Sequence, residues 1–349
     1  MTPLNMRDLS DSVRAERVNA IAAFGFTERQ ARFLVHVLVH AGVFLERQYC
    51  AFAGIAHGQK THDFLAKLVG GRYATVITPG ALHRGRLFHV QYKPLYEAIG
   101  EPDNRHRKPA SLGRMVERLM LLDAVLADRN HTWLGTENDK LAYFILGLLQ
   151  TRLRKNEYPN LTFGEGDNHT VRYFPDKLPI GVERNGGGRH VFLYLVTRDV
   201  PVDFRMFLQR HAELFRVVYE WTIRLLIPRR FRKAAALYRY AVRDELATPV
   251  HPSTVEELEW FFRERHGRSQ RAPRHPDLDP NLDLATAAQK FHAARFRSLE
   301  RMWLREGYRA VLAAQSPVLR DQLREGRGRI EFVELSHQYL QLTPLVGVA

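Results

Sequence analysis

The segment from residue 27 to residue 100 constrains the fold most strongly, because three short helical stretches precede two β-prone stretches joined by a basic turn. Thr27 and Gln30 have the spacing of a capping box, which satisfies free amides at the start of a helix. Gly42 is placed to end the first helix. The predicted elements are helices at 27–40, 45–52 and 59–69, an extended link at 43–44, and strands at 73–77 and 87–90.

This order predicts a winged-helix DNA-binding module in which the third helix enters the major groove and the basic turn is the wing. The exposed side of the third helix offers candidates for base contacts, and the wing offers candidates for phosphate contacts. The base-edge candidates are Gln59, Lys60 and His62, with Lys67 on the same polar face, and the phosphate candidates are Arg72, Arg84 and Arg86. The alternative is a small helical subdomain with a solvated hairpin.

Charge favours an anionic partner. The 349-residue chain has a formal net charge of +14 and a pI near 10.0, and nucleic acid is the commonest anionic partner of such a protein. A membrane surface is the rival, but we find no signal-peptide core, lipidation signal or long apolar stretch. We therefore expect a cytoplasmic protein without a membrane partner. Cys50 is the only cysteine, which excludes internal disulfides and cysteine zinc fingers.

The rest of the chain predicts an α+β fold with a central α/β core and a helical C-terminal region. The predicted parts are an N-terminal helix or arm (1–26), the winged helix (27–100), a polar linker (101–110), the α/β domain (111–250) and the C-terminal region (251–349). In the α/β domain we expect a core or dimer-forming helix at 111–127, strands at 177–183, 190–197 and 221–227, and helices at 203–220 and 229–246. The C-terminal helices are predicted at 254–266 and 284–314.

Over residues 27–246 the chain resembles the replication-relaxation type proteins of bacterial mobile elements and plasmids. The resemblance is carried by the helix–wing pattern ending in residues 92–100 and by Pro175-Asp176 before a hairpin. It implies a domain similar to the PD-(D/E)xK nuclease core, which uses an Asp on its first strand and an acid-x-Lys on its second to hold Mg²⁺.

This sequence keeps only part of that nuclease pattern. Asp176 matches the first acid, but residues 191–198 contain no acid-x-Lys. Glu137, Glu183 and Asp199 are the carboxylates that could complete a loose site. We therefore expect a degenerate, non-catalytic core without a metal or cofactor. The chain also lacks the common nucleotide-binding, zinc-protease and serine-hydrolase motifs, and the pair His36 and His40 has no third ligand nearby in sequence.

A second basic segment lies at residues 221–243, which contain no acidic residue. Its basic residues are Arg224, Arg229, Arg230, Arg232, Lys233, Arg239 and Arg243. A helix beginning at Arg229 would add its dipole to these charges, which favours phosphate binding. The sequence therefore predicts a second DNA-contacting surface, with a solvated helix face as the alternative.

These observations favour a sequence-specific, non-catalytic protein that binds double-stranded DNA and serves a mobile element as a regulator or as a replication or transfer accessory factor. The alternatives are a metal-dependent nuclease or replication-initiation enzyme, and a protein-binding subunit of a larger assembly. The further partners that the sequence allows are a second copy of the chain and a protein bound through the C-terminal region.

Overall fold

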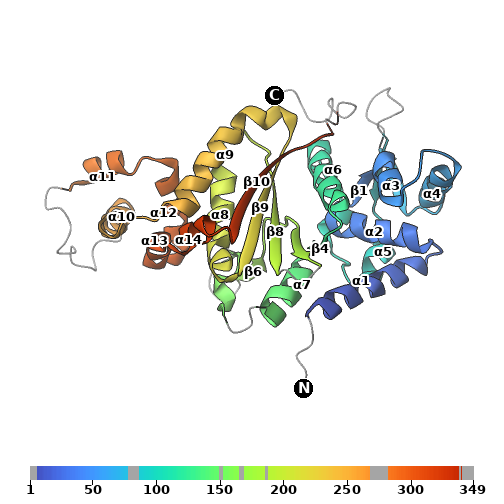
Figure 1. Ribbon diagram of the computed structural model, residues 1–349, viewed down its shortest axis with the longest axis horizontal. Coiled ribbons are helices and arrows are strands. Elements are labelled where there is room, and N and C mark those ends of the chain that lie inside the picture. Colours follow the sequence, from blue (N-terminus) through green and yellow to red (C-terminus); the bar gives the residue numbers. More distant parts are fainter. Residues whose placement is uncertain are drawn as a thin grey trace, which may run out of the picture.

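The computed structural model describes residues 6–77, 86–148, 152–164, 169–184, 188–267, 282–337 and 339. These residues form a mixed α+β structure (Figure 1) with a small helical and β unit at one end, a five-stranded sheet in the middle and a helical unit at the other end. No helix within the described ranges is both long and apolar enough to cross a bilayer.

Within residues 6–98 the described elements form the N-terminal unit, and the three helices and two strands predicted between residues 27 and 90 agree with the structure to within about one residue. The elements of this unit are α1 (Met6–Ala22), α2 (Glu28–His40), β1 (Val43–Leu45), α3 (Glu46–Ala53), α4 (Gln59–Gly70), β2 (Ala74–Ile77), β3 (Leu87–Val90) and α5 (Lys93–Ala98). The predicted capping box is confirmed, because Thr27 and Gln30 exchange side-chain-to-backbone hydrogen bonds. The predicted extended link is strand β1, which completes an antiparallel sheet of order β1-β3-β2.

The central sheet has the strand order β10-β9-β8-β7-β4. Its elements and neighbours are α6 (Leu112–Ala127), β4 (His131–Leu134), α7 (Glu137–Lys140), the π-helix η3 (Leu141–Leu148), η4 (Lys155–Glu157), the ribbon β5 (Asn160–Phe163) and β6 (Thr170–Tyr173), β7 (Ile180–Glu183), β8 (Arg189–Leu195), α8 (Val202–Val217) and β9 (Glu220–Ile227). Strands β4, β7 and β8 are antiparallel, and α8 connects β8 to the parallel strand β9. The strand–helix–strand order predicted over residues 190–227 thus forms a parallel crossover, and β10 (Gly328–Glu334) adds a second parallel pairing, to β9, from a strand that the sequence did not predict.

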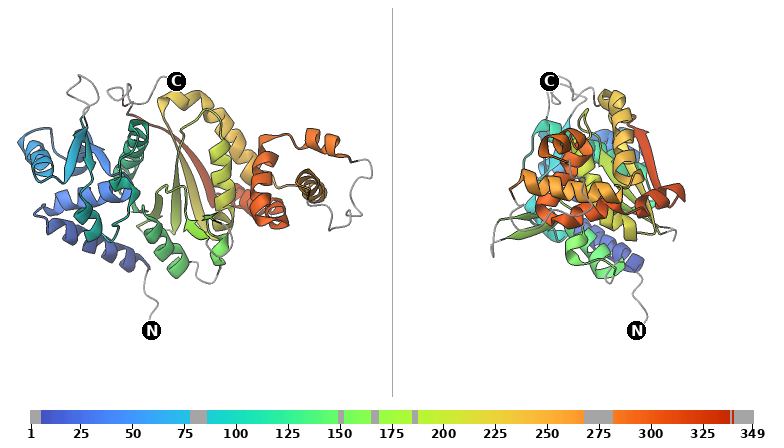
Figure 2. Two further views of the ribbon diagram at one scale, coloured as in Figure 1. Left: turned by 180° about the vertical axis from the view of Figure 1, so that it is seen from behind. Right: turned by 90° about the vertical axis from the view of Figure 1, so that its left-hand side faces the viewer.

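Both faces of the central sheet are covered, as alternate residues of β8 show. Val191 and Leu193 pack in the same core as α6 and the N-terminal unit, whereas Phe192 and Tyr194 pack in the core beneath α8. Figure 2 shows the resulting layers, with α6 and the N-terminal unit on one side of the sheet and α8 with α9 (Ala235–Val242) on the other. Helix α6 is thus a core helix, which accounts for its apolar stripe without a dimer.

The predicted linker at 101–110 does not separate two cores. It contains the short helix η2 (Arg105–Arg107), and His106 is only 5% exposed. His89 Nε2 donates a hydrogen bond to the His106 carbonyl oxygen at 3.0 Å. The N-terminal unit and one face of the central sheet share a single apolar core, so residues 101–110 do not act as a hinge between two separate cores.

The C-terminal helices enclose a third apolar core. They are α10 (Pro252–Arg265), α11 (Leu284–Lys290), α12 (Ala294–Glu306) and α13 (Tyr308–Gln315). The following helix, α14 (Val318–Arg324), packs instead in the core beneath α8 through Leu319. The prediction of a single helix at 284–314 is therefore wrong, because this range contains α11, α12 and α13. Gly307, with φ +64°, separates α12 from α13, because this left-handed conformation cannot continue a helix.

Two other predicted elements differ from the structure. The strand predicted at 177–183 begins only at Ile180, because Phe174 and Lys177 have positive φ and form a turn ahead of it. The helix predicted at 229–246 is a 3-10 helix, η6 (Arg229–Ala234), followed by α9 and the π-helix η7 (Arg243–Ala247).

Candidate nucleic-acid interface

Helix α4 presents a largely polar surface because its large apolar residues face inward, except Val69, which is 40% exposed near the end of the helix. Phe64, Leu65 and Leu68 are buried against the N-terminal unit. The opposite side exposes the three predicted base-edge candidates, Gln59, Lys60 and His62. The Gln59 side chain donates a hydrogen bond to Asp63 Oδ1 at 2.6 Å, which orients it along the helix surface. The start of α4 therefore carries solvent-exposed side chains that can donate or accept hydrogen bonds.

Lys67 lies apart from these groups, although it belongs to the same helix. Its ammonium group donates to the Gly25 carbonyl oxygen and lies 4.8 Å from the centre of the Phe26 ring. This cation–π contact holds the end of α4 against the turn between α1 and α2. In this position Lys67 stabilises the N-terminal unit.

The predicted wing is described only at its base, and Arg84 lies outside the described residues. Arg72 is exposed and has φ +57°, an uncommon conformation for a residue with a side chain. Arg86 is also exposed, and its guanidinium lies 3.8 Å from Glu46 of α3. Glu46 also contacts His57 at 2.7 Å. One of the two described candidates for phosphate binding, Arg86, thus has an acidic neighbour.

A basic groove continues from α4 toward the central sheet. It has a volume of about 860 Å³ and lies between helices α2–α4 and the turns that flank β4 and follow β7. Its charged lining residues are Arg14, Arg29, Arg32, Lys60, Arg129 and Arg184, with Glu28, Asp63 and Asp128 as the acids. Basic residues thus outnumber acidic ones two to one, which favours an anionic ligand.

Part of this positive charge is already engaged within the protein. Arg32 pairs with Glu28 one helical turn away, and Arg29 donates to the Ala53 carbonyl oxygen at 3.3 Å. Arg129 and Arg184 are exposed residues in turns of the central sheet, although Arg129 also donates to the Phe52 carbonyl oxygen at 3.5 Å. These two arginines and Lys60 are therefore the groove residues best placed to meet phosphate.

Sequence reasoning missed Arg129 and Arg184. Each is an isolated basic residue in a turn, separated from α4 by more than 50 residues, and no local pattern marks it. Arg129 and Arg184 lie on the same wall of the basic groove as Lys60 only because the N-terminal unit packs on the central sheet.

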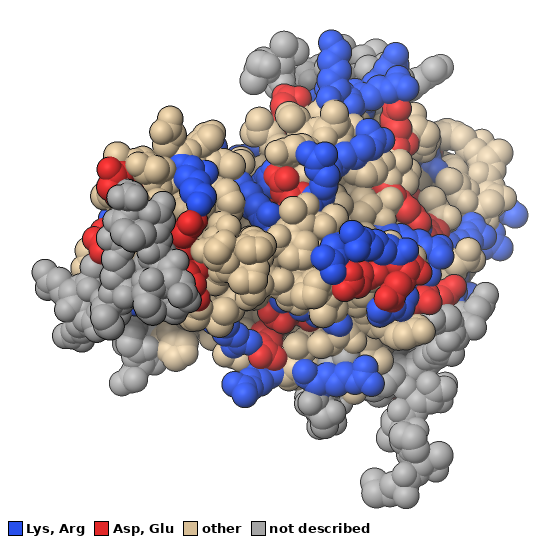
Figure 3. Space-filling view, turned by 60° about the vertical axis from the view of Figure 1, so that its left-hand side comes forward, with Lys and Arg blue, Asp and Glu red and all other residues tan. Residues whose placement is uncertain are grey.

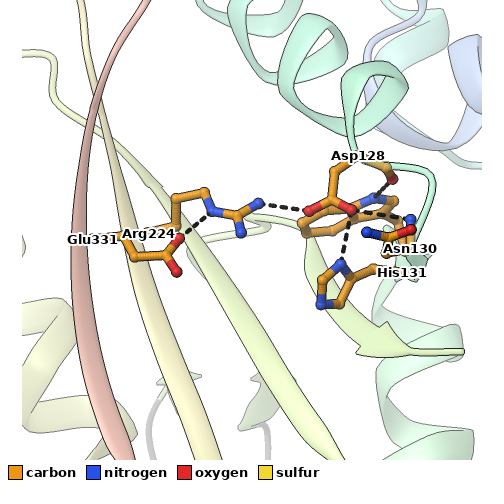
Figure 4. A network of polar contacts seen from close by, with 6 residues as sticks. Asp128, Asn130, His131, Arg224 and Glu331 are labelled. Carbon is orange, nitrogen blue, oxygen red and sulfur yellow. Dashed lines mark hydrogen bonds and ion pairs between the residues drawn. The ribbon is translucent and has the colours of Figure 1, made fainter. Parts of the chain in front are cut away.

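Arg224 does not belong to a free basic surface. Figure 4 shows its guanidinium between two carboxylates, with Nε 2.6 Å from Glu331 and Nη1 2.7 Å from Asp128. Burial acts to raise the pKa of the Asp128 carboxyl, but hydrogen bonds from Arg224 and His131 outweigh it and lower that pKa. The acids that pair with Arg224 come from the end of α6 and from β10, distant in sequence, so the absence of acidic residues within 221–243 does not leave Arg224 unpaired.

The other predicted residues of this segment, Arg229, Arg230, Arg232 and Lys233, are exposed on η6. Arg232 lies 3.2 Å from Glu334, and the Arg230 guanidinium lies 4.4 Å from the centre of the Phe231 ring. Figure 3 shows lysine and arginine gathered at the top of the molecule, the end where α9 lies, while acidic side chains are interspersed lower on that face. A second basic surface is therefore present, but its helix is a short 3-10 segment with little dipole.

Two of the four carboxylates considered for nuclease chemistry, Asp176 and Glu137, are held in structural contacts. Asp176 accepts two hydrogen bonds from Arg210 Nη1, at 2.7 and 2.9 Å. Glu137 accepts a hydrogen bond from the Tyr173 amide at 2.8 Å. Among the residues that the structure describes, no group of three or more His, Cys, Asp or Glu side chains could hold a metal ion. His36 and His40 stack with ring centres 6.0 Å apart, and His36 contacts Arg14 at 2.7 Å.

Comparisons of the chain with protein-family models, with curated proteins and with solved structures find no match. A functional assignment therefore depends on the residues and geometry of this chain.

Proposed function

We propose that this chain binds double-stranded DNA, with the N-terminal unit acting as a winged helix and α4 as its recognition helix. Gln59, Lys60 and His62 would contact base edges, and Arg72 with Arg86 would contact phosphates beside the wing. The continuity of these groups with the basic groove is the observation that supports the proposal. Lys60 lies both on the exposed side of α4 and on the wall that carries Arg129 and Arg184.

The role that we propose is non-catalytic, in the cytoplasm of a bacterial cell. Asp176 is engaged with Arg210, and β8 presents apolar side chains where the nuclease pattern would require an acid and a lysine. A central sheet of this kind would serve as a scaffold that supports the winged helix. With the resemblance noted above, a regulator or a replication or transfer accessory factor of a mobile element fits best.

Selection of duplexes from a random pool by the full chain tests this proposal. Fluorescence anisotropy then measures affinity for the selected duplex and for an unrelated duplex. We expect Gln59→Ala and Lys60→Ala to weaken binding to the selected duplex by about 5- to 150-fold, the effect of losing a base contact worth about 1–3 kcal/mol. Binding to the unrelated duplex should change less.

Arg72→Asn separates phosphate contacts from base contacts. Asparagine tolerates the left-handed conformation at this position, so the backbone should be retained while the charge is lost. Binding to both duplexes should weaken equally, and the slope of log affinity against log salt should fall by about one. Arg301→Ala, which removes an exposed arginine of α12, is the matched control. A pool in which no duplex is enriched would contradict the proposal and favour protein binding through α4.

A further inference from the structure

A separate cavity lies where the N-terminal unit meets the central sheet. It has a volume of about 270 Å³, and residues of α1, α2, β4, α7 and η3 line it. Its walls are mainly apolar and include Val39, Trp133, Leu134 and Tyr143. An apolar cavity of about 150 Å³ can hold benzene, so this cavity has room for a larger ring system. The flat faces of Trp133 and Tyr143 favour an aromatic ligand.

The charged side chains on the cavity wall are already engaged within the protein. Arg17 Nη2 lies 2.8 Å from Asp139, and Arg17 Nε donates to the Ile99 carbonyl oxygen at 3.1 Å. Arg14 Nη2 donates to His36 Nε2 at 2.7 Å. Burial lowers the pKa of His36 well below its usual value, so this ring accepts the hydrogen bond as a neutral imidazole. Because a charged ligand would lose its hydration without gaining a free partner of opposite charge, the cavity favours an uncharged ligand.

His40 is a polar side chain of this wall that has no hydrogen-bond partner among the described residues. It is 5% exposed, and its Nδ1 atom is fully buried and unpaired. Nδ1 and Cε1 pack against Gly135, where an added Cβ atom would lie 2.5 Å from Nδ1. The ring stacks on His36 with ring centres 6.0 Å apart. Nε2 is therefore the nitrogen of His40 that a ligand in the cavity could reach.

A hydroxyl group is the ligand group that suits His40 best. Burial lowers the pKa of His40 to about 3, so at neutral pH the ring is uncharged. Nε2 of a neutral imidazole is a donor in one tautomer and an acceptor in the other. A hydroxyl both donates and accepts, so it can pair with either tautomer. An aromatic ring that carries one hydroxyl is a phenol.

The position of the cavity in the fold is also typical of a ligand site. Ala142 and Tyr143 come from η3, an eight-residue π-helix, and π-helical turns occur frequently at functional sites. Small-molecule sites commonly form between domains, with apolar walls and a few polar groups that orient the ligand. The cavity has each of these properties, with His40 as the orienting group.

We propose that this cavity binds a small uncharged phenol, with its ring against Trp133 and Tyr143 and its hydroxyl hydrogen-bonded to His40. The site does not depend on DNA binding, and its test contains no DNA. His36 and Trp133 also line the basic groove. A bound phenol would therefore contact the wall that separates the cavity from the groove.

Fluorescence titration of 2-naphthol with the full chain at neutral pH tests the proposal. Naphthalene, which lacks the hydroxyl, is measured by its competition with 2-naphthol. We expect one naphthol per chain, bound about three- to tenfold more tightly than naphthalene, the usual effect of one hydrogen bond between neutral groups. The anion 2-naphthoate should bind at least tenfold more weakly than 2-naphthol, because its charge would be dehydrated in the cavity.

Two variants locate the ligand. His40→Leu removes the hydrogen bond, so 2-naphthol should bind as weakly as naphthalene, while naphthalene binding stays within twofold of the original chain. Ala142→Phe should fill the cavity and weaken binding of both probes at least tenfold. Ala236→Phe makes the same change at an exposed position of α9 and should leave binding unchanged.

Several outcomes would overturn the proposal without any variant. They are the absence of 2-naphthol binding at millimolar concentration, equal binding of 2-naphthol and naphthalene, and tighter binding of 2-naphthoate than of 2-naphthol. A preference for 2-naphthol that persists in His40→Leu would also overturn it, as would binding that Ala142→Phe leaves intact.

Discussion

At the scale of single residues, Arg205 shows how this fold accommodates a buried cation. Its side chain is 4% exposed and lies 2.8 Å from Asp244 and 2.6 Å from Glu245. Burial raises the pKa of Glu245, although hydrogen bonds from Gln209 and Arg205 oppose that rise. The charge of Arg205 on α8 and the charges of Asp244 and Glu245 on η7 therefore stabilise one another.

We expect Arg205→Met to lower the free energy of unfolding by about 3–5 kcal/mol, because it leaves buried carboxylates without their cation. Urea denaturation at neutral pH measures this change. Adding Glu245→Gln to Arg205→Met should recover part of the loss, since it removes one of the stranded charges. If Arg205→Met alone is as stable as the original chain, the ion pairs of Arg205 contribute nothing to the free energy of unfolding.

Buried histidines should make the protein sensitive to mild acid. Burial lowers the pKa of His190 and of His211 to about 4 in the folded chain. Because the unfolded chain takes up these protons near pH 6.5, stability rises with pH and is lost progressively from about pH 6.5 down to about pH 4. By pH 5 each group should have cost about 2 kcal/mol relative to pH 7.

His211→Gln isolates one of these groups. His211 Nδ1 donates to the Phe207 carbonyl oxygen at 2.9 Å, and the ring packs among aromatic side chains. The variant should be less stable at pH 7 but should lose about 2 kcal/mol less between pH 7 and pH 5. Denaturation curves at both pH values give the difference, and the exposed control His292→Gln should retain the original slope. An unchanged slope in His211→Gln would show that His211 is already protonated in the folded chain at pH 5.

Local sequence signals identified some residues and missed others for a physical reason. Thr27 and Gln30 were predictable because a capping box involves neighbours only three positions apart. The exposure of Gln59 and Lys60 followed from the apolar face of their own helix. The contacts of Arg224 were not predictable, because its two carboxylate partners lie about 100 residues away in opposite directions along the chain.

At the scale of elements, β8 and β9 were predictable, whereas β10 was not. These two strands lie inside the sheet and are nearly continuous apolar runs, as strands covered on both faces must be. β10 alternates Arg329 and Glu331 with Ile330 and Phe332, and it lies at the edge of the sheet. Only its alternate residues are apolar, because they face a single core. The charged residues between them made this segment look unlike the continuous apolar strands of the sheet.

The turn after β4 packs tightly against α2 and joins the N-terminal unit to the sheet. A Cβ atom on Gly135 would lie 2.3 Å from Val39 Cγ1 and 2.5 Å from His40 Nδ1. We expect Gly135→Ala to lower the free energy of unfolding by about 1–3 kcal/mol, the usual cost of overpacking a core. Thermal and urea denaturation measure the loss.

Gly113→Ala is a matched control for that substitution. A Cβ atom on Gly113 meets no atom within 4 Å, and the residue lies in α6. Replacing a helical glycine by alanine should raise stability by about 0.5–1 kcal/mol. If both variants change stability alike, the contact between the turn and α2 is looser than the structure indicates.

At the scale of the whole molecule, the shared core makes the N-terminal unit part of one body with the central sheet. Residues of α2, α4, α6 and β8 contribute to the same apolar cluster. The wall formed by Lys60, Arg129 and Arg184 should therefore keep its shape when DNA binds. A duplex on α4 would then meet the turns of the sheet without rearrangement of the protein.

Two basic surfaces of this body can be compared at equal charge. Reversing Arg129 and Arg184 to glutamate alters the basic groove, and reversing Arg229 and Arg230 alters η6. Each pair of substitutions lowers the formal net charge from +14 to +10. A difference between the two variants must therefore come from where the charges lie, since long-range attraction changes equally.

We expect the groove variant to bind the selected duplex much more weakly and to lose protection next to the contacts of α4. Each phosphate contact that is removed should reduce the salt slope by about one. The η6 variant should shorten the protected region at its far end while keeping the contacts centred on α4, if η6 forms the second surface predicted from the sequence. Hydroxyl-radical footprinting and anisotropy across a salt series measure both effects. Equal losses of affinity with unchanged footprints would mean that net charge alone holds the DNA, and that neither surface makes a defined contact.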